Sequence, residues 1–179
     1  IPIARIIADD FPWKRAAQMS LQGRLLFRDV ENWMLDRYAA ILTISEVAQA
    51  ELTRTLQRPI GVAGCATGID PTAAADQPPT IVPDRPILLL VGTIEPRKNY
   101  AALDRIVTPE LLERWQIVVV GRAGWKGADE DLRALTARFP ADVFWLDDAS
   151  DAHLRWLYRH ARAFLTLSHA EGFNMRSEE

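Results

Sequence analysis

Short apolar runs alternate with longer amphipathic stretches through the second half of the chain. The clearest run, Ile87–Val91, contains no polar residue and is followed by Gly92. Such a run is typical of a parallel strand buried on both faces, and apolar residues at helical spacing between the runs predict helices. We expect strands at residues 87–91, 117–120, 143–146 and 163–167, and helices from about 99, at 128–139 and after a Ser150 cap. This alternation predicts an α/β fold on a parallel sheet with right-handed crossovers.

The first half shows the same alternation with fewer elements. Its apolar runs predict strands at residues 4–8, 40–44 and 60–63. Residues 14–40 carry apolar side chains at helical spacing, which predicts one helix over this range, with Gly23 as a point of interruption. Ser45 is expected to cap a further helix, because its hydroxyl can accept a hydrogen bond from the first helical turn.

A proline-rich stretch separates the two halves. Residues 70–86 contain five of the eleven prolines in the chain. Proline fixes the backbone angle φ and has no N–H to donate, so this stretch is expected to be extended and without regular structure. We therefore place a first domain at 1–70, a linker at 71–86 and a second domain at 87–179.

The composition is that of an ordinary globular protein. Hydrophobic residues make up 49% of the 179 residues, and the formal net charge of −3 argues against nucleic acid as the main partner. Cys65 is the one cysteine, so no internal disulfide can form, which fits a reducing, cytoplasmic compartment. Because Cys65 lies in an apolar stretch, we expect a small buried residue rather than a nucleophile. No apolar run reaches about 18 residues, so no membrane-spanning helix is expected.

Candidate chemistry lies in the loops after the strands, where open parallel sheets bind their ligands. Arg97 and Lys98 precede an expected helix, whose N-terminus would add free N–H groups to a phosphate site. Their alternative interpretation is a solvated surface pair. Gly121 begins a glycine-rich turn that either approaches a ligand or simply reverses the chain. Glu171 follows the last strand and is either a site carboxylate or a solvated loop residue.

The loop after the first of these strands carries the most specific signal. Residues 91–99, Val-Gly-Thr-Ile-Glu-Pro-Arg-Lys-Asn, closely resemble the start of the C-terminal domain in glycosyltransferase family 4, whose members are retaining enzymes with the GT-B fold. Other segments resemble the same family, namely Ile44-Ser45-Glu46, Gly68-Ile69-Asp70, Val118 to Gly121, Trp145-Leu146, and Ser168 with Glu171-Gly172-Phe173. The resemblance implies Rossmann-like parallel sheets, with part of the acceptor-side domain at 1–70 and most of the donor-binding domain at 87–179.

The resemblance also implies roles for individual residues. Lys98 and Arg97 would bind the donor diphosphate and stabilise charge on the leaving group, with no metal and no cofactor beyond the nucleotide-sugar substrate. Glu171 would lie by the anomeric carbon, which completes the set of catalytic candidates. The backbone near Asp148 and Ala149 would contact the base. The full set of implied donor-binding residues is Gly92, Thr93, Arg97, Lys98, Gly121, Asp148, Ala149, Gly172, Phe173 and Glu179.

One segment and one single residue depart from the pattern of that family. Residues 174–178 follow Phe173 where relatives carry Gly-Leu-Pro, and Ala8 stands where many relatives carry a histidine near the donor sugar. Glu179 falls eight positions after Glu171, which is the family's spacing for the glutamate that holds the ribose. The altered residues between the two glutamates leave the role of Glu179 open.

The activity that the resemblance implies is transfer of a hexose, such as the mannose of GDP-mannose, to a glycan or lipid-linked acceptor with retention of configuration. Bacterial polysaccharide biosynthesis is the expected setting. Since both ends of the chain look truncated, we expect weak nucleotide binding and little turnover. Two alternatives stay open, a GT-B nucleotide-sugar epimerase and a degenerate domain that binds nucleotide or a partner without catalysis. Peripheral association with the inner face of the membrane also stays open.

Overall fold

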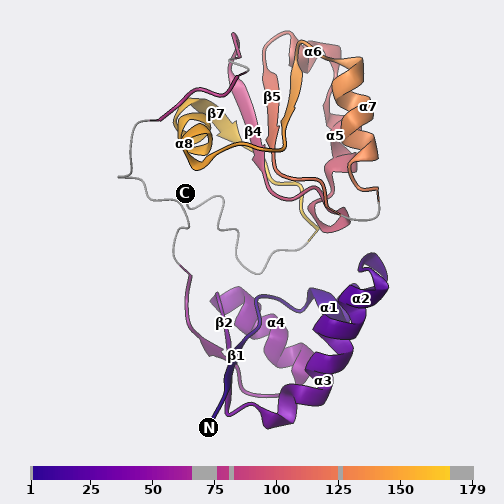
Figure 1. Cartoon of the computed structure of the whole chain (residues 1–179), viewed down its shortest axis with the longest axis vertical. Helices are drawn as coiled ribbons and strands as arrows, with labels where there is room; N and C mark the ends of the chain where they lie inside the picture. Colours follow the sequence, from indigo (N-terminus) through magenta and orange to yellow (C-terminus); the bar gives the residue numbers. More distant parts are fainter. Residues whose placement is uncertain (1, 66–75, 81–82, 125–126, 170–179) are drawn as a thin grey trace. The chain divides into compact units, whose positions relative to one another are not determined.

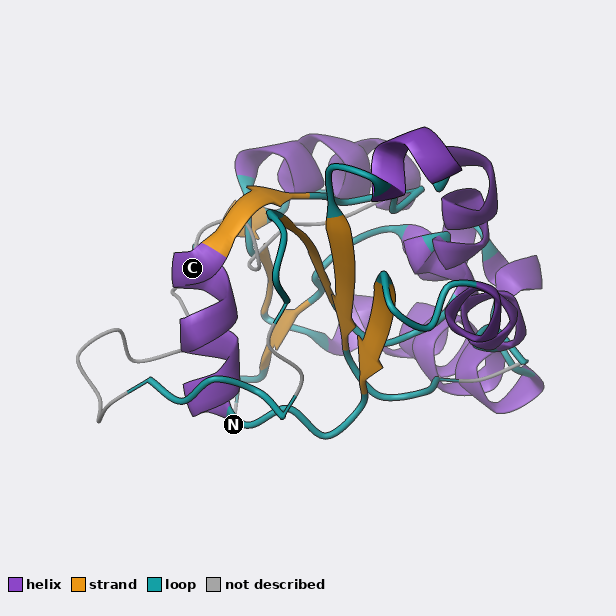
Figure 2. Ribbon diagram, turned by 90° about the horizontal axis from the view of Figure 1, so that it is seen from above, coloured by secondary structure: helices purple, strands orange, loops and turns teal. Residues whose placement is uncertain are grey.

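The computed structural model describes residues 2–65, 76–80, 83–124 and 127–169 of the chain. The chain divides into two compact units, and among these residues the first unit holds 2–65 and the second holds the rest (Figure 1). Each unit contains its own parallel sheet with helices beside it. Figure 2 distinguishes the helices, strands and loops of the chain by colour.

The sheet of the second unit has four parallel strands in the order β6-β5-β4-β7. The strands are β4 (Ile87–Val91), β5 (Gln116–Val120), β6 (Val143–Leu146) and β7 (Ala161–Phe164). The chain moves outward from β4 to β6 and then returns to the other side of β4, so the strand order reverses between β4 and β7. Such a reversal is where open parallel sheets form ligand crevices.

Three of these strands confirm the prediction, and the fourth begins earlier than predicted. We expected a strand at 163–167, but β7 starts at Ala161, directly after a helix that ends at His160. The pairing of Ala161 with Ile87 fixes this start. The amide of Leu165 still donates a 2.8 Å hydrogen bond to the carbonyl oxygen of Leu89, so the chain follows β4 slightly beyond the strand.

Helices cover both faces of this sheet (Figure 1). On one face lie α5 (Leu103–Ile106), α6 (Pro109–Leu112) and α7 (Glu130–Arg138), and on the other lies α8 (Asp151–His160). The predicted cap of α8 is confirmed, because the Ser150 hydroxyl accepts a 3.2 Å hydrogen bond from the His153 amide. The predicted helix from about residue 99 instead begins with 3-10 turns at Pro96–Lys98 and Tyr100–Ala102, and the chain breaks again before Pro109.

The first unit has a three-stranded parallel sheet in the order β1-β2-β3. The strands are β1 (Ala4–Ile6), β2 (Ala40–Thr43) and β3 (Gly61–Val62), and α4 (Glu46–Leu56) follows β2. The cap of α4 is confirmed, since the Ser45 hydroxyl accepts a 3.0 Å hydrogen bond from the amide of Ala48. Buried Ile41 and Leu52 join β2 to α4 in the core of this unit.

The prediction of a single helix at 14–40 is wrong in its first part. The chain instead forms α1 (Phe11–Lys14), a 3-10 turn (Ala16–Gln18), α2 (Leu21–Arg24), a π-helical stretch (Leu25–Val30), α3 (Glu31–Met34) and a 3-10 turn (Leu35–Arg37). The break precedes residue 21 because the Ser20 hydroxyl accepts a 3.0 Å hydrogen bond from the Gly23 amide and caps a new helix there. Gly23 therefore lies inside the cap and does not interrupt the helix.

The prediction that Cys65 is buried is also wrong. Strand β3 ends at Val62, and residues 62–65 are exposed. An apolar sequence stretch predicted burial here, but the chain has left the sheet before it reaches the cysteine.

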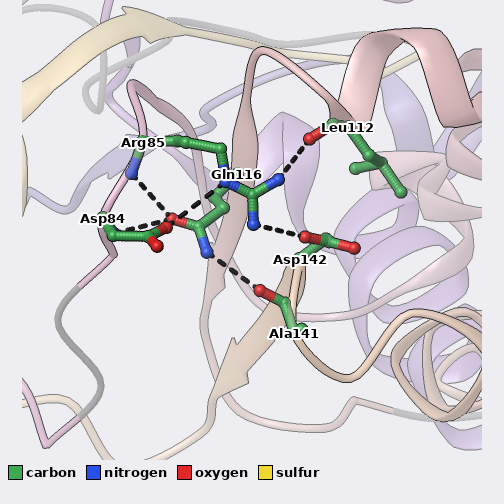
Figure 3. A network of polar contacts seen from close by, with 6 residues as sticks. All are labelled: Asp84, Arg85, Leu112, Gln116, Ala141 and Asp142. Carbon is green, nitrogen blue, oxygen red and sulfur yellow. Dashed lines mark hydrogen bonds and ion pairs between the residues drawn. The ribbon is translucent and has the colours of Figure 1, made fainter.

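A buried glutamine joins the entry of β4 to two neighbouring segments of the second unit (Figure 3). The Gln116 side-chain oxygen accepts hydrogen bonds from the amides of Asp84 (2.9 Å) and Arg85 (3.0 Å), and its amide group donates to the Ala141 carbonyl oxygen at 2.9 Å. The Arg85 guanidinium binds the Asp142 carboxylate at 2.5 Å. Gln116 is only 4% exposed, so two of its hydrogen bonds hold the chain ahead of β4 in place and the third holds the chain ahead of β6.

Replacing Gln116 with methionine is expected to lower the free energy of unfolding by about 2–3 kcal/mol. Methionine keeps the volume but removes three hydrogen bonds, and each contributes roughly 1 kcal/mol. The midpoint of urea unfolding measures the change, and Gln22→Met at an exposed helical position is the control, expected within about 0.5 kcal/mol of the parent. Equal midpoints for the Gln116→Met variant and the parent would contradict the structural role of this side chain.

Candidate functional site

A cavity of about 320 Å³ lies at the carboxyl ends of β4, β5 and β6. We call it the strand-end cavity. Its lining consists of Val91, Gly92, Thr93, Val120, Gly121, Arg122, Asp147, Asp148, Ala149 and Leu154. The volume lies in the range of small-molecule sites, and the cavity lies beyond the carboxyl ends of the strands, where open parallel sheets bind ligands. Five residues of the predicted donor set line this one cavity, namely Gly92, Thr93, Gly121, Asp148 and Ala149.

The loops after β4 and β5 are joined to each other through their backbones. The Gly92 amide donates to the Val120 carbonyl oxygen at 2.9 Å, and the Ile94 amide donates to the Arg122 carbonyl oxygen at 2.9 Å. A Cβ atom placed on Gly121 would lie 2.0 Å from the Gly92 carbonyl oxygen. Gly121 is therefore required by the close approach of two backbones, a reason that its sequence position alone does not reveal.

Two aromatic side chains hold the carbonyl groups of these glycines. The Tyr100 hydroxyl donates a 2.9 Å hydrogen bond to the Gly92 carbonyl oxygen, and the Trp145 indole N–H donates one of 2.8 Å to that of Gly121. Both aromatic side chains pack in or against the hydrophobic cluster on the α5–α7 face of the sheet. They fix the orientation of the peptide groups at the rim of the cavity, a role that the sequence pattern indicates for neither of them.

Arg97 is paired with a buried carboxylate. Its Nε and Nη2 atoms lie 3.1 and 2.8 Å from Oε1 of Glu95, and the side chains are 22% and 7% exposed respectively. The family resemblance implies a phosphate-binding role for Arg97 and no role for Glu95. The ion pair commits a large part of the guanidinium to holding the 95–98 turn.

Lys98 lies against the backbone of the cavity rim. Its Cε and Nζ atoms are 3.4 and 3.6 Å from the point where a Cβ atom of Gly92 would stand. The expected helix N-terminus beside Lys98 is absent from this stretch, because Asn99 adopts a left-handed conformation (φ 57°) and a 3-10 turn follows it. A helix dipole therefore adds little to this position, and the positive charge comes from the lysine itself.

The turn at 97–99 also holds the segment that follows β7. The Asn99 side-chain amide donates to the Leu167 carbonyl oxygen at 3.1 Å, and the His169 amide donates to the Arg97 carbonyl oxygen at 3.0 Å. These contacts bring the last described residues next to the turn that carries Lys98. The predicted residues Glu171, Gly172, Phe173 and Glu179, and the departing segment 174–178, lie outside the described residues.

Two further properties concern the described part of the chain. Within residues 2–65, 76–80, 83–124 and 127–169, no cluster of three or more histidine, cysteine, aspartate or glutamate side chains is arranged to hold a metal ion. Over the same residues, no helix has the length and apolar character that a bilayer crossing requires.

A family model and two curated proteins are similar to this chain. The family model described as "Glycosyl transferases group 1" matches residues 72–176. The serotype-specific mannosyltransferase WbdA of Escherichia coli is 34% identical over 96 residues, which cover 50% of this chain and 11% of WbdA. The O-antigen chain mannosyltransferase B of Escherichia coli is 28% identical over 155 residues, which cover 79% of this chain and 40% of that protein. This chain thus spans less than half the length of either relative.

Solved structures show the same fold over almost the whole chain. The sucrose-phosphate synthase of Thermosynechococcus elongatus has a TM-score of 0.67 at 18% identity, covering 96% of this chain and 45% of its own. WaaG, a glycosyltransferase involved in lipopolysaccharide biosynthesis, has a TM-score of 0.63 at 17% identity, covering 98% and 53%. At these identities the likeness establishes the fold alone, which is the α/β GT-B fold with Rossmann-like parallel sheets. Since the family model matches more than half of the chain, this protein belongs to the group 1 glycosyltransferases.

Proposed function

We propose that the second unit carries the nucleotide-sugar donor site of a glycosyltransferase that transfers mannose to a glycan or lipid-linked acceptor. The observation that carries the proposal is the strand-end cavity, with Lys98 next to its lining residue Gly92, in a chain of this family. The two Escherichia coli relatives named as mannosyltransferases support mannose as the sugar. The name of the O-antigen chain mannosyltransferase supports a polysaccharide acceptor.

In this proposal Lys98 binds the donor diphosphate and stabilises the negative charge that develops there as the sugar leaves. A fixed ammonium beside a partly dehydrated cavity contributes more to such a charge than the same group in water. Tyr100 and Trp145 keep the glycine backbones at the rim in place, so the phosphate position is formed before the ligand arrives. This chemistry needs no cofactor beyond the donor substrate. Retention of configuration, with Glu171 next to the sugar, and GDP-mannose as the donor belong to the same proposal.

Replacing Lys98 with alanine is expected to weaken binding of a nucleoside diphosphate by about tenfold. One charge-assisted hydrogen bond to phosphate contributes roughly 1.5–3 kcal/mol, and 1.4 kcal/mol corresponds to a factor of ten. Calorimetric titration of the parent and the variant with GDP, UDP and ADP measures the change. Arg105→Ala is the matched control, because it removes one cation from an exposed position on α5 that does not line the cavity.

Equal affinities for the Lys98→Ala variant and the parent would contradict the phosphate role of this lysine. A second measurement addresses the reaction type in a form of the protein with both complete domains. Incubation with a labelled sugar donor should give a glycosylated acceptor and released nucleoside diphosphate. Conversion of the donor into its epimer without transfer would instead favour an epimerase.

A further inference from the structure

Residues 76–79, which we call the strap, lie against helix α8 (Figure 1). They belong to the stretch predicted as a linker, and their backbone is irregular. The Asp76 carboxylate binds the Arg159 guanidinium at 2.5 Å, and its other oxygen lies 3.4 Å from Nε of Arg155. The side chains of Asp76 and Arg155 are 15% and 10% exposed, so this ion pair is largely removed from water.

The charges on α8 favour a carboxylate at this position. Arg155 and Arg159 are four residues apart on one helix, so their side chains are neighbours and their like charges repel. The two oxygens of Asp76 bring a negative charge to both of them. Removing this carboxylate would weaken the compensation of the mostly buried Arg155 charge, which is strongly unfavourable. The strap would also lose its charged contact with α8.

The same turn of α8 forms part of the strand-end cavity. Leu154 lines the cavity and is buried in the hydrophobic cluster on the α8 face of the sheet. Leu154 directly precedes Arg155 in the chain. It lies two residues after Ala152, whose carbonyl oxygen accepts a 3.3 Å hydrogen bond from the Gln77 amide of the strap. Because the residues of a helical turn move together, a shift of this turn that loosens the strap also moves Leu154.

We infer that Asp76 is a positioning residue for the donor site and acts through α8. The docked strap holds the first turns of α8 in the position in which Leu154 completes the cavity wall. A nucleoside diphosphate in the cavity then favours the docked strap, and the docked strap favours binding by the same factor, because coupling between two sites is reciprocal. This step rests on the proposed function. Since the strap belongs to the stretch that joins the two units in sequence, binding of the donor acts on their connection as well.

The first measurement is calorimetric titration of the parent and three variants with GDP, UDP and ADP. Asp76→Ala should weaken binding of the tightest of the three by about threefold to tenfold. Asp76→Glu keeps the carboxylate and should restore most of the parent affinity. Asp104→Ala is the matched control, because it breaks an ion pair with Arg138 whose side chains are 61% and 50% exposed and which does not line the cavity. Its affinity should stay within about twofold of the parent.

The second measurement separates coupling from a general loss of stability. The Gln77 amide is hydrogen-bonded to α8 in the docked strap, so its hydrogen exchange reports on docking. In the parent, saturating nucleotide should slow this exchange by a factor similar to the loss of affinity in Asp76→Ala. In Asp76→Ala the nucleotide should leave it unchanged. The amide of Arg133, bonded to the Asp129 carbonyl oxygen at the start of α7, should not respond in either protein. A residue that only stabilises the fold would give no such response.

The outcomes separate this inference from the proposed function. If none of the three nucleotides binds the parent, the donor site and the coupling both fail. If the parent and Asp76→Ala bind nucleotide equally, the donor site stands and the positioning role is overturned, even where the variant is less stable. A loss of affinity without any effect of nucleotide on Gln77 exchange overturns the coupling through the strap. A loss of affinity that Asp76→Glu reverses, together with slower Gln77 exchange in the parent, supports it.

Discussion

Replacing Gly121 with alanine is expected to lower the free energy of unfolding of the second unit by about 3–5 kcal/mol. The added Cβ would lie 2.0 Å from the carbonyl oxygen of Gly92, a backbone atom that cannot rotate away. The two loops must then separate, which removes the hydrogen bonds from Gly92 to Val120 and from Ile94 to Arg122. Each of these bonds contributes roughly 1 kcal/mol, and the strained φ of 151° adds about 1–3 kcal/mol for a residue with a side chain.

Gly92→Ala is the matched control for this change. Gly92 has nearly the same backbone angle, with φ 153°, and it lines the same cavity. A Cβ atom there would meet the side chains of Lys98 and Tyr100 at 3.4 Å, which is an ordinary contact distance. The free energy of unfolding of Gly92→Ala should therefore fall by about 1–3 kcal/mol, which is the contribution of backbone strain alone. Urea unfolding of both variants measures the difference. Equal destabilisation would show that separating the loops after β4 and β5 does not lower the stability.

The strands and caps could be predicted because their causes are local. The run Ile87–Val91 has no polar residue and forms a strand, and Ser45 and Ser150 each accept the capping hydrogen bond that their position predicts. The later start of the helical stretch at residue 21 also has a local cause, since Ser20 is a capping residue. Apolar spacing alone does not indicate this break, because it continues on both sides of Ser20.

The identity of long-range polar partners could not be predicted. Gln116 lies at the start of an apolar run, and nothing near it in the sequence indicates that it binds residues 84, 85 and 141. In the site, strand order brings Gly92, Gly121 and Asp148 together, so knowing the strand ends was sufficient to group them. The contact between Gly121 and Gly92 depends on how closely two loops approach, which spacing along the chain does not encode.

The different contacts of Arg97 and Lys98 also could not be predicted. The sequence shows two adjacent cations, and only the structure distinguishes them. Lys98 lies beside the rim of the cavity, whereas Arg97 forms two short contacts with one oxygen of the buried Glu95. The two residues should therefore respond differently to substitution. Loss of Lys98 should act on nucleotide binding, and loss of Arg97 should act first on stability.

Replacing Arg97 with alanine is expected to lower the free energy of unfolding by about 3–4 kcal/mol. Glu95 is 6% exposed, and removing one partner of a buried ion pair leaves a carboxylate without compensation in a poorly hydrated position. Adding Glu95→Gln to Arg97→Ala removes the uncompensated charge. The double variant should therefore have a free energy of unfolding at least about 1 kcal/mol higher than that of Arg97→Ala, and it should stay below that of the parent because the ion pair is lost. Arg105→Ala, at an exposed position of the same unit, is the control and should remain within about 0.5 kcal/mol of the parent. Urea unfolding of the parent, the two single variants Arg97→Ala and Glu95→Gln, and the double variant completes a double-mutant cycle, with Arg105→Ala measured beside them. If Arg97→Ala and the double variant are equally stable, the buried charge of Glu95 is not the cause of the loss.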